Sequence, residues 1–242
     1  MLHSVIPEQL AKVYQQVTNA CHKSRRDPAK VKILAVSKTQ PAEAIRAAAT
    51  TGQRAFGENY LQEALQKQQQ LTDLPELEWH FIGAVQSNKT REIAENFAWL
   101  HTLDRQKIAQ RLNDQRPAHL PKLNVLIQVN ISNEASKAGI APTALLALAQ
   151  QVVKLPHLTL RGLMCIPKAS DTVAEQRQAF AQLAALQKTL EKELQDTLPD
   201  LTLNTLSMGM SGDLEAAIAE GSTLVRIGTA IFGTREKKDS HD

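Results

Sequence analysis

Lys38 is the residue of this sequence whose setting most suggests chemistry. It lies in VKILAVSKTQP (residues 31–41), where an apolar run typical of a buried strand is followed by Pro41, which favours the start of a helix. A lysine at such a junction has a half-buried stem, and desolvation or nearby cations turn a half-buried amine into a nucleophile that forms Schiff bases. An isolated lysine after a strand is more often a solvated loop residue, so the interpretation depends on what lies near it.

Two turns near the end of the sequence are candidates for binding an anion. SMGMSGD (207–213) places Ser207 and Ser211 between a strand and a helix, with Ser211 expected as the helix N-cap, and RIGTAIFG (226–233) places Gly228 and Thr229 after the next strand. Free backbone N–H groups and positive helix ends bind phosphate at such turns. Each turn alone favours an ordinary cap or glycine turn. Adjacent in the fold, they predict a phosphate pocket.

A reactive lysine opposite a phosphate pocket fits two kinds of chemistry. One is binding of pyridoxal 5'-phosphate (PLP), and the other is a class I aldolase that acts on a sugar phosphate. Neither turn is a Walker loop or a GxGxxG fingerprint, so a nucleotide is not indicated. The seven histidines show no spacing typical of metal ligands, and His80 is compatible with a hydrogen-bonded core residue. Residue spacing alone does not separate the cofactor from the aldolase.

Strand and helix signals alternate along the chain and indicate how these residues are positioned. Leu10, Val13, Val17 and Cys21 have helical spacing, and about eight strand–helix units follow. Such repeats imply parallel strands, and their number predicts a single-domain α/β protein, a (β/α)8 TIM barrel with an extra N-terminal helix, rather than an open doubly wound sheet. The expected parts are an N-terminal helix (1–30), the barrel (31–235) and a short polar tail (236–242). The expected strands are 31–37, 54–57, 78–83, 98–102, 123–130, 158–164, 203–207 and 224–227.

The composition limits the class of protein. Among 242 residues, 28 basic and 25 acidic side chains are spread along the chain, so no basic cluster indicates nucleic-acid binding. Cys21 and Cys165 have no CxxC partner and are expected to be reduced thiols. No signal peptide and no apolar run of membrane-spanning length is visible, so we expect a cytoplasmic protein that does not bind membranes.

Six segments of the sequence closely resemble the PLP homeostasis protein family, whose members resemble the barrel domain of alanine racemase standing alone. The resemblance runs from about residue 8 to residue 235 of the chain. The segments that carry it are AVSKTQP (35–41), FGENYLQEALQK (56–67), WHFIGAVQSNK (79–89), LIQVNISNEASKAG (126–139), RGLMCIP (161–167) and SMGMSGDLEAAIAEGSTLVRIGTAIFG (207–233).

The resemblance implies a role for each candidate residue. Lys38 would carry PLP as an internal aldimine, and Arg226 would face the pyridine nitrogen. Ser207, Ser211, Gly228 and Thr229 match positions around the phosphate. The residues that match the lining of the pocket are Asn59, His80 and Met164.

The resemblance also implies a function in vitamin B6 homeostasis, with PLP held, buffered or delivered rather than used in catalysis. An arginine, always cationic, would leave the pyridine nitrogen unprotonated and the ring a weak electron sink. The chain stops at Asp242, so we expect the second domain that supplies the opposing tyrosine of alanine racemases to be missing. The alternatives are a weak PLP-dependent racemase or lyase, and then the aldolase. We expect a monomer whose partners are PLP and PLP-dependent apo-enzymes or B6 salvage enzymes, with Lys89 and Lys137 as candidates for assisting transfer.

Overall fold

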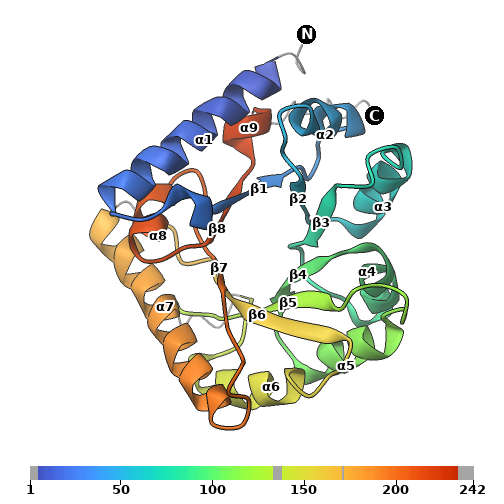
Figure 1. Ribbon diagram of the computed structural model, residues 1–242, viewed down its shortest axis with the longest axis vertical. Coiled ribbons are helices and arrows are strands. Elements are labelled where there is room, and N and C mark those ends of the chain that lie inside the picture. Colours follow the sequence, from blue (N-terminus) through green and yellow to red (C-terminus); the bar gives the residue numbers. More distant parts are fainter. Residues whose placement is uncertain (1–4, 133–137, 171, 234–242) are drawn as a thin grey trace, which may run out of the picture.

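Eight parallel strands close into a barrel, which confirms the predicted fold class. In the computed structural model, which describes residues 5–132, 138–170 and 172–233, the strands follow one another around the barrel in chain order (Figure 1). The predicted tail, 236–242, lies outside the described residues. The strands are β1 (Lys32–Val36), β2 (Ala55–Glu58), β3 (Glu78–Phe81), β4 (Trp99–Leu103), β5 (Leu123–Gln128), β6 (Leu158–Met164), β7 (Thr205–Ser207) and β8 (Leu224–Ile227).

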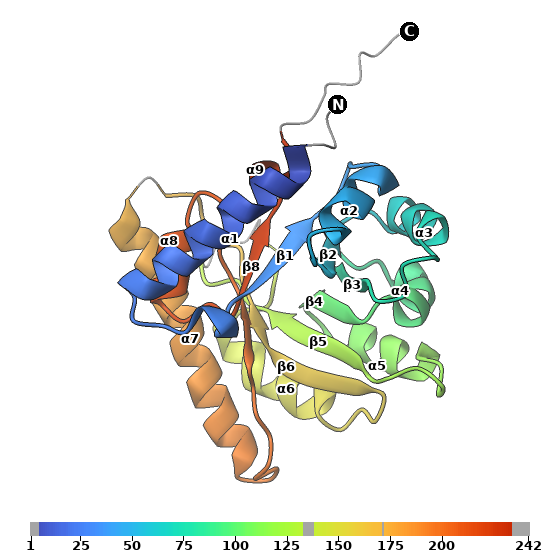
Figure 2. The ribbon, with the colours of Figure 1, turned by 45° about the horizontal axis from the view of Figure 1, so that its top comes forward.

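The helices surround the barrel, and the N-terminal helix covers one side of it. Figure 2 shows α1 lying beside α8 and α9, and it packs against both. Arg26, just beyond α1, donates to the backbone oxygens of Ile218 and Ser222 at 2.7 and 2.6 Å. The helices are α1 (Ile6–Lys23), α2 (Ala42–Ala49), α3 (Leu61–Gln70), α4 (Thr90–Asn96), α5 (Gln106–Gln115), α6 (Leu145–Val152), α7 (Val173–Gln195), α8 (Leu214–Ala219) and α9 (Thr229–Phe232). Within the described ranges, none of these is long and apolar enough to span a bilayer.

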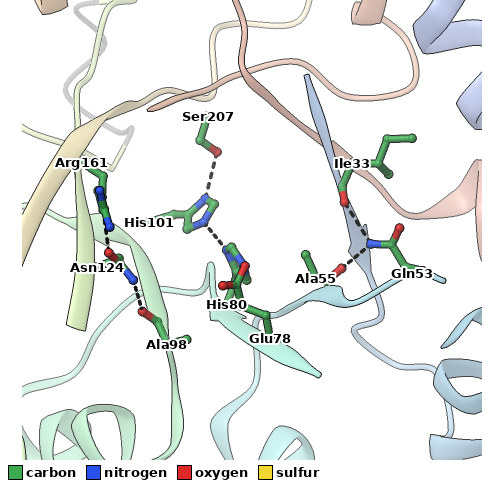
Figure 3. Close-up of polar contacts among 10 residues, drawn as sticks. All are labelled: Ile33, Gln53, Ala55, Glu78, His80, Ala98, His101, Asn124, Arg161 and Ser207. Atoms are coloured by element: carbon green, nitrogen blue, oxygen red, sulfur yellow. Dashed lines mark hydrogen bonds and ion pairs between the residues drawn. The ribbon is translucent and has the colours of Figure 1, made fainter. Parts of the chain in front are cut away.

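The apolar core lies between the strands and the helices. Ile33, Ala35 and Phe56 belong to one cluster with residues of α1 and α2, and Val125 and Leu163 belong to a second cluster with residues of α5 to α7. Because successive side chains of a strand point to opposite faces, the residues between these point into the barrel. Many of those are polar: Arg226 and the residues drawn in Figure 3, which are Glu78, His80, His101, Asn124, Arg161 and Ser207.

Two predicted helices begin later than expected. The sequence pattern also predicts a polar helix from Glu58 to about Leu71, but α3 begins at Leu61, because Glu58 is the last residue of β2 and its buried carboxylate is held by hydrogen bonds. The helix expected from Ser211 begins at Leu214. In the first case the contact that holds Glu58 in the strand is distant in sequence, whereas in the second the contact between Asp213 and Met210 lies within the turn itself.

Gly162 marks the closest approach between two strands. Its φ is +150°, and a Cβ at this position would lie 1.9 Å from the backbone oxygen of Thr205 and 2.5 Å from Oε1 of Gln187. Only glycine therefore allows β6 to pair with β7 at this point.

Replacing Gly162 by alanine is expected to lower the free energy of unfolding by about 3 kcal/mol or more, because backbone strain and overpacking add. Gly52 is the matched control, since it also has a positive φ, +94°, but no atom within 4 Å of a built Cβ. Gly52→Ala is expected to cost about 1–2 kcal/mol, from backbone strain alone. Urea-induced unfolding measures both variants, and equal losses would contradict the close approach.

Candidate functional site

The turn after β7 is held against β8 by backbone hydrogen bonds, and β8 leads directly into the second predicted turn at Gly228. The N–H of Met208 donates to the oxygen of Leu224 at 3.2 Å, and the N–H of Arg226 donates to the oxygen of Gly209 at 2.9 Å. Gly209 has a φ of +98°, and a Cβ there would lie 2.5 Å from Cβ of Ala217. The predicted adjacency of the two turns is therefore confirmed.

Asp213, rather than Ser211, closes the turn that leads into α8. Its Oδ1 accepts the N–H of Met210 at 2.6 Å, and Asp213 is the residue at the N-cap position. The expectation that Ser211 is the N-cap is wrong, because the Asp213 carboxylate accepts the hydrogen bond of the turn and Asp213 stands at the N-cap position. Ser211 stays exposed, with its hydroxyl available at the mouth of the barrel. Burial raises the pKa of the Asp213 carboxyl, and its bond to Met210 and the charge of Arg226 oppose that shift.

The turn after β8 leads directly into the short helix α9. Gly228 is its N-cap and Thr229 its first residue; the N–H of Ile231 already donates to the Gly228 oxygen at 2.9 Å, whereas the N–H groups of Thr229 and Ala230 form no backbone hydrogen bond among the described residues. A Cβ on Gly228 would lie 3.2 Å from the backbone oxygen of Val36, the last residue of β1. This turn therefore lies beside the end of β1, two residues before Lys38.

Both neighbours of Lys38 are held by side chains of β2 and α3. The Ser37 hydroxyl donates to Oε1 of Glu58 at 2.6 Å, and Nζ of Lys67 donates to the Ser37 carbonyl at 2.8 Å. On the other side, the N–H of Thr39 donates to Oε1 of Glu63 at 2.6 Å, and Thr39 has a left-handed φ of 65°. We call Ser37, Glu58, Glu63 and Lys67 the lysine clamp. It fixes the backbone from which the Lys38 side chain extends.

The Lys38 amine itself is uncommitted. Its side chain is half-buried, and it forms no hydrogen bond or ion pair with any part of the chain that the structure describes. A fixed backbone and an unpaired amine together suit a lysine that must bind something else.

The clamp contains a buried ion pair that the sequence did not reveal. Nζ of Lys67 lies 2.8 Å from Oε1 of Glu58, with side-chain exposures of 6% and 0%. Burial raises the pKa of Glu58, while the charge and hydrogen bond of Lys67 oppose the rise. The sequence could have indicated only the pair of Glu63 and Lys67, which are four residues apart on one helix face. No sequence pattern indicated that Lys67 also pairs with Glu58.

Asn59 follows the clamp residue Glu58 and carries an unsatisfied polar atom. Its Oδ1 is buried and has no hydrogen-bond partner among the described residues. The backbone at Asn59 is also tightly packed, since a Cβ on Gly83 would lie 2.1 Å from the Asn59 carbonyl oxygen. Buried oxygens without partners are costly, so this one is a candidate for contacting a ligand.

Arg226 is buried inside the barrel and is held by three acceptors. Its guanidinium donates to the carbonyl and hydroxyl oxygens of Ser207 at 2.7 and 2.8 Å, and to the carbonyl oxygen of Cys165 at 2.9 Å. Burial lowers the pKa of Arg226, and the side chains of Cys165 and Asp213 oppose that shift. The Ser207 hydroxyl is therefore engaged within the barrel.

From Ser207 a chain of hydrogen bonds runs through the barrel interior (Figure 3). Nδ1 of His101 lies 2.9 Å from the Ser207 hydroxyl, and Nε2 of His101 lies 2.9 Å from Nδ1 of His80. Nε2 of His80 then lies 2.9 Å from Oε1 of Glu78. Desolvation lowers the pKa of His80, and desolvation, with the charges of His80 and Arg226, lowers the pKa of His101 well below its usual range. Both imidazoles are therefore neutral near pH 7.

The direction of every hydrogen bond in this chain follows from its two ends. A carboxylate only accepts, so His80 donates from Nε2 to Glu78, and its Nδ1 must accept from Nε2 of His101. His101 then accepts at Nδ1 from the Ser207 hydroxyl, whose oxygen accepts from Arg226. All donors point from the buried cation Arg226 toward the carboxylate Glu78. We call these residues, Arg226, Ser207, His101, His80 and Glu78, the barrel relay.

The predicted site residues therefore fall into two groups. His80 lies in the interior and reaches the mouth only through His101 and Ser207, and Met164 is fully buried beside Trp99 and Leu126. Lys89 pairs with Glu92 at 3.4 Å, and Lys137 lies outside the described residues. The residues that follow strands at the same mouth are Lys38, Asn59, Ser211, Gly228 and Thr229, with Ser207 and Arg226 just below them.

Comparison with known proteins relates this chain to one family. The model of the alanine racemase N-terminal domain matches residues 9–236. The pyridoxal phosphate homeostasis protein of Pseudomonas aeruginosa is 59% identical, over 96% of this chain and 97% of its own length. Its counterpart in Escherichia coli K12 is 51% identical, over 96% and 97%.

Solved structures agree with this relationship. PipY of Synechococcus elongatus, described with PLP bound, superposes with a TM-score of 0.82 at 41% identity, over 94% of this chain and all (100%) of that chain. Alanine racemase of Corynebacterium glutamicum gives 0.67 at 18% identity, over 99% of this chain and 63% of the enzyme. The latter likeness shows the fold alone.

Replacing Lys67 by methionine is expected to lower the free energy of unfolding by about 3–5 kcal/mol at neutral pH, because it leaves the buried Glu58 carboxylate without its cation. The folded-state pKa of Glu58 is already raised above 4.5. Removing Lys67 raises it further, so the folded variant binds a proton more readily than its unfolded chain. The deficit should therefore shrink as the pH falls toward 5.

Urea unfolding at several pH values measures this deficit. A second change, Glu58→Gln, should recover much of the loss in the Lys67→Met background. Lys12→Met is the control, since Lys12 belongs to an exposed pair with Glu8 and should matter little. A deficit that is constant with pH would show that Glu58 is not the group left uncompensated.

Proposed function

Since this chain belongs to the alanine racemase N-terminal domain family and, within it, to the pyridoxal phosphate homeostasis proteins, we propose that it binds PLP at the C-terminal mouth of its barrel and takes part in PLP homeostasis. The observation that carries the proposal is the clamped but unpaired Lys38 at the mouth where the turns after β7 and β8 also lie. The PLP-bound PipY structure, at 41% identity, supports the same ligand.

The residues at this mouth fit the cofactor's functional groups. When bound, PLP supplies an aldehyde that reacts with amines and a pyridine ring that withdraws electrons. Lys38 provides the amine, and the clamp holds its backbone so that little entropy is lost when the cofactor is attached covalently. The buried, unsatisfied Oδ1 of Asn59 offers an acceptor beside it.

For the phosphate, we assign the turn residues Ser211, Gly228 and Thr229. The free N–H groups at the start of α9 and two exposed hydroxyls are the donors that a phosphate dianion needs. Ser207 contributes less directly, because its hydroxyl already bonds Arg226 and His101. Its role in this proposal is to hold Arg226 in place.

Arg226 is assigned to the side of the pyridine nitrogen. A guanidinium has five N–H donors, and three hydrogen bonds to Ser207 and Cys165 leave two for a ligand. A permanently cationic neighbour keeps the ring nitrogen unprotonated and so disfavours carbanion formation. Together with the names of the relatives, this supports a protein that holds, buffers or delivers PLP rather than a racemase, lyase or aldolase.

The setting of the protein is also part of the proposal. Cys21 and Cys165 are both buried free thiols, which suits a reducing cytoplasm. We propose a monomer that passes PLP to apo-enzymes or exchanges it with B6 salvage enzymes. Size-exclusion chromatography tests the first point, and transfer of cofactor to an added apo-enzyme tests the second.

Replacing Lys38 by alanine is expected to abolish the yellow visible absorption band of the purified protein, because the amine that binds the aldehyde is lost. Absorption spectra of both proteins after incubation with added PLP measure the change. Lys188→Ala, which removes an exposed lysine from α7, is the control and should keep the band. A band of equal intensity in the Lys38 variant would rule out Lys38 as the site of attachment.

The PLP-loaded protein is expected to leave the optical rotation of L-alanine unchanged, because Arg226 keeps the ring a weak electron sink. Polarimetry over hours with excess substrate measures this. A time-dependent loss of rotation that disappears in Lys38→Ala would establish the racemase alternative instead.

A further inference from the structure

A cavity opens at the other end of the barrel, away from the residues assigned to PLP. Its volume is about 440 Å³, which is large enough for a small metabolite. The lining includes the first residues of six strands, which places it at the N-terminal mouth: Lys32, Ala55, Glu78, Trp99, Thr205 and Leu224.

Cations outnumber carboxylates around this cavity. Lys30, Lys32 and Arg161 line it, against the single carboxylate of Glu78. None of the three cations forms an ion pair within 4 Å in the part of the chain that the structure describes. Lys32 acts on Glu78 only from a distance, where it lowers the pKa of that carboxyl after the larger effect of the His80 hydrogen bond. The cavity is therefore positively charged, and its lysine and arginine side chains have no carboxylate partner among the described residues.

Arg161 is held in place while its terminal nitrogens remain uncommitted. Its Nε donates to Oδ1 of Asn124 at 2.7 Å (Figure 3), and its guanidinium lies 6.0 Å from the centre of the Trp99 ring. The Trp99 ring in turn stacks on His80, with centroids 5.2 Å apart and planes at 4°. A fixed guanidinium whose two terminal NH2 groups form no hydrogen bond with the described residues suits a phosphate or carboxylate group.

The same cavity contains one end of the barrel relay. Glu78 and His80 both line it, and His80 is 1% exposed. From His80 the relay passes through His101 and Ser207 to Arg226 without a gap, since each link is between 2.8 and 2.9 Å. An anion bound beside Glu78 would change the field at one end of a chain of aligned dipoles whose other end is Arg226.

We propose that the cavity at the N-terminal mouth is a second ligand site, for a small molecule that carries a phosphate or carboxylate group, and that its occupancy changes the affinity for PLP through the barrel relay. The first half is independent of the proposed function, while the second half depends on it. Arg161, Lys32 and Lys30 bind the anion. Asn204 and Thr205, also in the lining, are polar residues that can contact the remainder of the bound ligand.

The expected sign of the coupling follows from the direction of the relay. An anion in the cavity draws Lys32 away from Glu78 and leaves the carboxylate more strongly negative toward His80. The hydrogen bonds from Ser207 to Glu78 then polarise further, and the Ser207 oxygen holds Arg226 more tightly. The hydrogen bonds that Arg226 can donate to the cofactor are then weaker, so a bound anion weakens PLP binding. By linkage, PLP weakens anion binding by the same factor.

Trp99 provides a direct measurement of binding at the cavity. In a Trp79→Phe background it is the remaining tryptophan, and its fluorescence can be followed during titration with inorganic phosphate, with sodium chloride at equal ionic strength as the reference. We expect a saturable change whose dissociation constant rises about tenfold in Arg161→Gln, the effect of losing a charged hydrogen bond. Arg91→Gln, which removes an exposed charge from α4, should leave it unchanged. Lys32→Gln, at an exposed position, gives an independent loss if Arg161→Gln does not fold.

A second titration tests the coupling. The dissociation constant for PLP, from the visible band, is measured with saturating phosphate and with chloride. Phosphate can also compete with PLP at the turn residues assigned to the cofactor's phosphate group. That competition is expected in Arg161→Gln as well. We expect the rise in the PLP dissociation constant that phosphate causes to be about fivefold larger in the parent than in Arg161→Gln. In His101→Gln, which interrupts the relay, we expect the rise to be no larger than in Arg161→Gln.

The outcomes separate the two halves. A fluorescence response that does not saturate, or that Arg161→Gln and Arg91→Gln change alike, overturns the second site. A saturable response with equal phosphate effects on PLP affinity in the parent and in Arg161→Gln overturns the coupling. A protein that binds no PLP overturns the proposed function and the coupling, while the fluorescence titration still decides the second site.

Discussion

The buried guanidinium of Arg226 constrains the interior of this barrel more than any other group. A cation removed from water must be surrounded by acceptors, and Arg226 finds three in Ser207 and Cys165. The Ser207 hydroxyl in turn needs an acceptor, which is His101, and the pattern continues to Glu78. Barrels of this kind usually fill their interior with branched apolar residues. Here the interior holds a polar relay, and the apolar core lies between the strands and the outer helices.

A second buried charge, Lys67, organises the other side of the same mouth. Its pairing with Glu58 anchors the carbonyl before Lys38, while Glu63 anchors the N–H after it. Lys38 is thus an unpaired side chain on a backbone that is held on both sides, an arrangement that favours holding a ligand at low entropic cost. In the proposed function, the clamp would support the lysine that binds the aldehyde, and Arg226 would lie on the side of the ring nitrogen. A site of that kind would hold PLP firmly and give its ring little catalytic power.

The sequence predicted the barrel and the mouth because those features depend on local patterns. Apolar runs closed by glycine marked the strands, and the proximity of the β7 and β8 turns followed from barrel topology. What it missed depends on pairs distant in the chain: Ser207 and His101 are 106 residues apart, and Ser37 and Glu58 are 21 apart. The helix start at Leu214 was misplaced for a subtler reason, because Ser211 and Asp213 are both good caps and only the turn geometry chooses between them. The direction of the relay needed both of its ends, which no single motif contains.

The central claim is that Lys38 holds PLP at this mouth. The most direct measurement is borohydride reduction of the PLP-loaded protein, followed by peptide mass spectrometry. The mass of the reduced cofactor is expected on the peptide that contains Lys38. Its presence on the Lys89 or Lys137 peptide instead, or on no peptide at all, would show that Lys38 does not hold PLP.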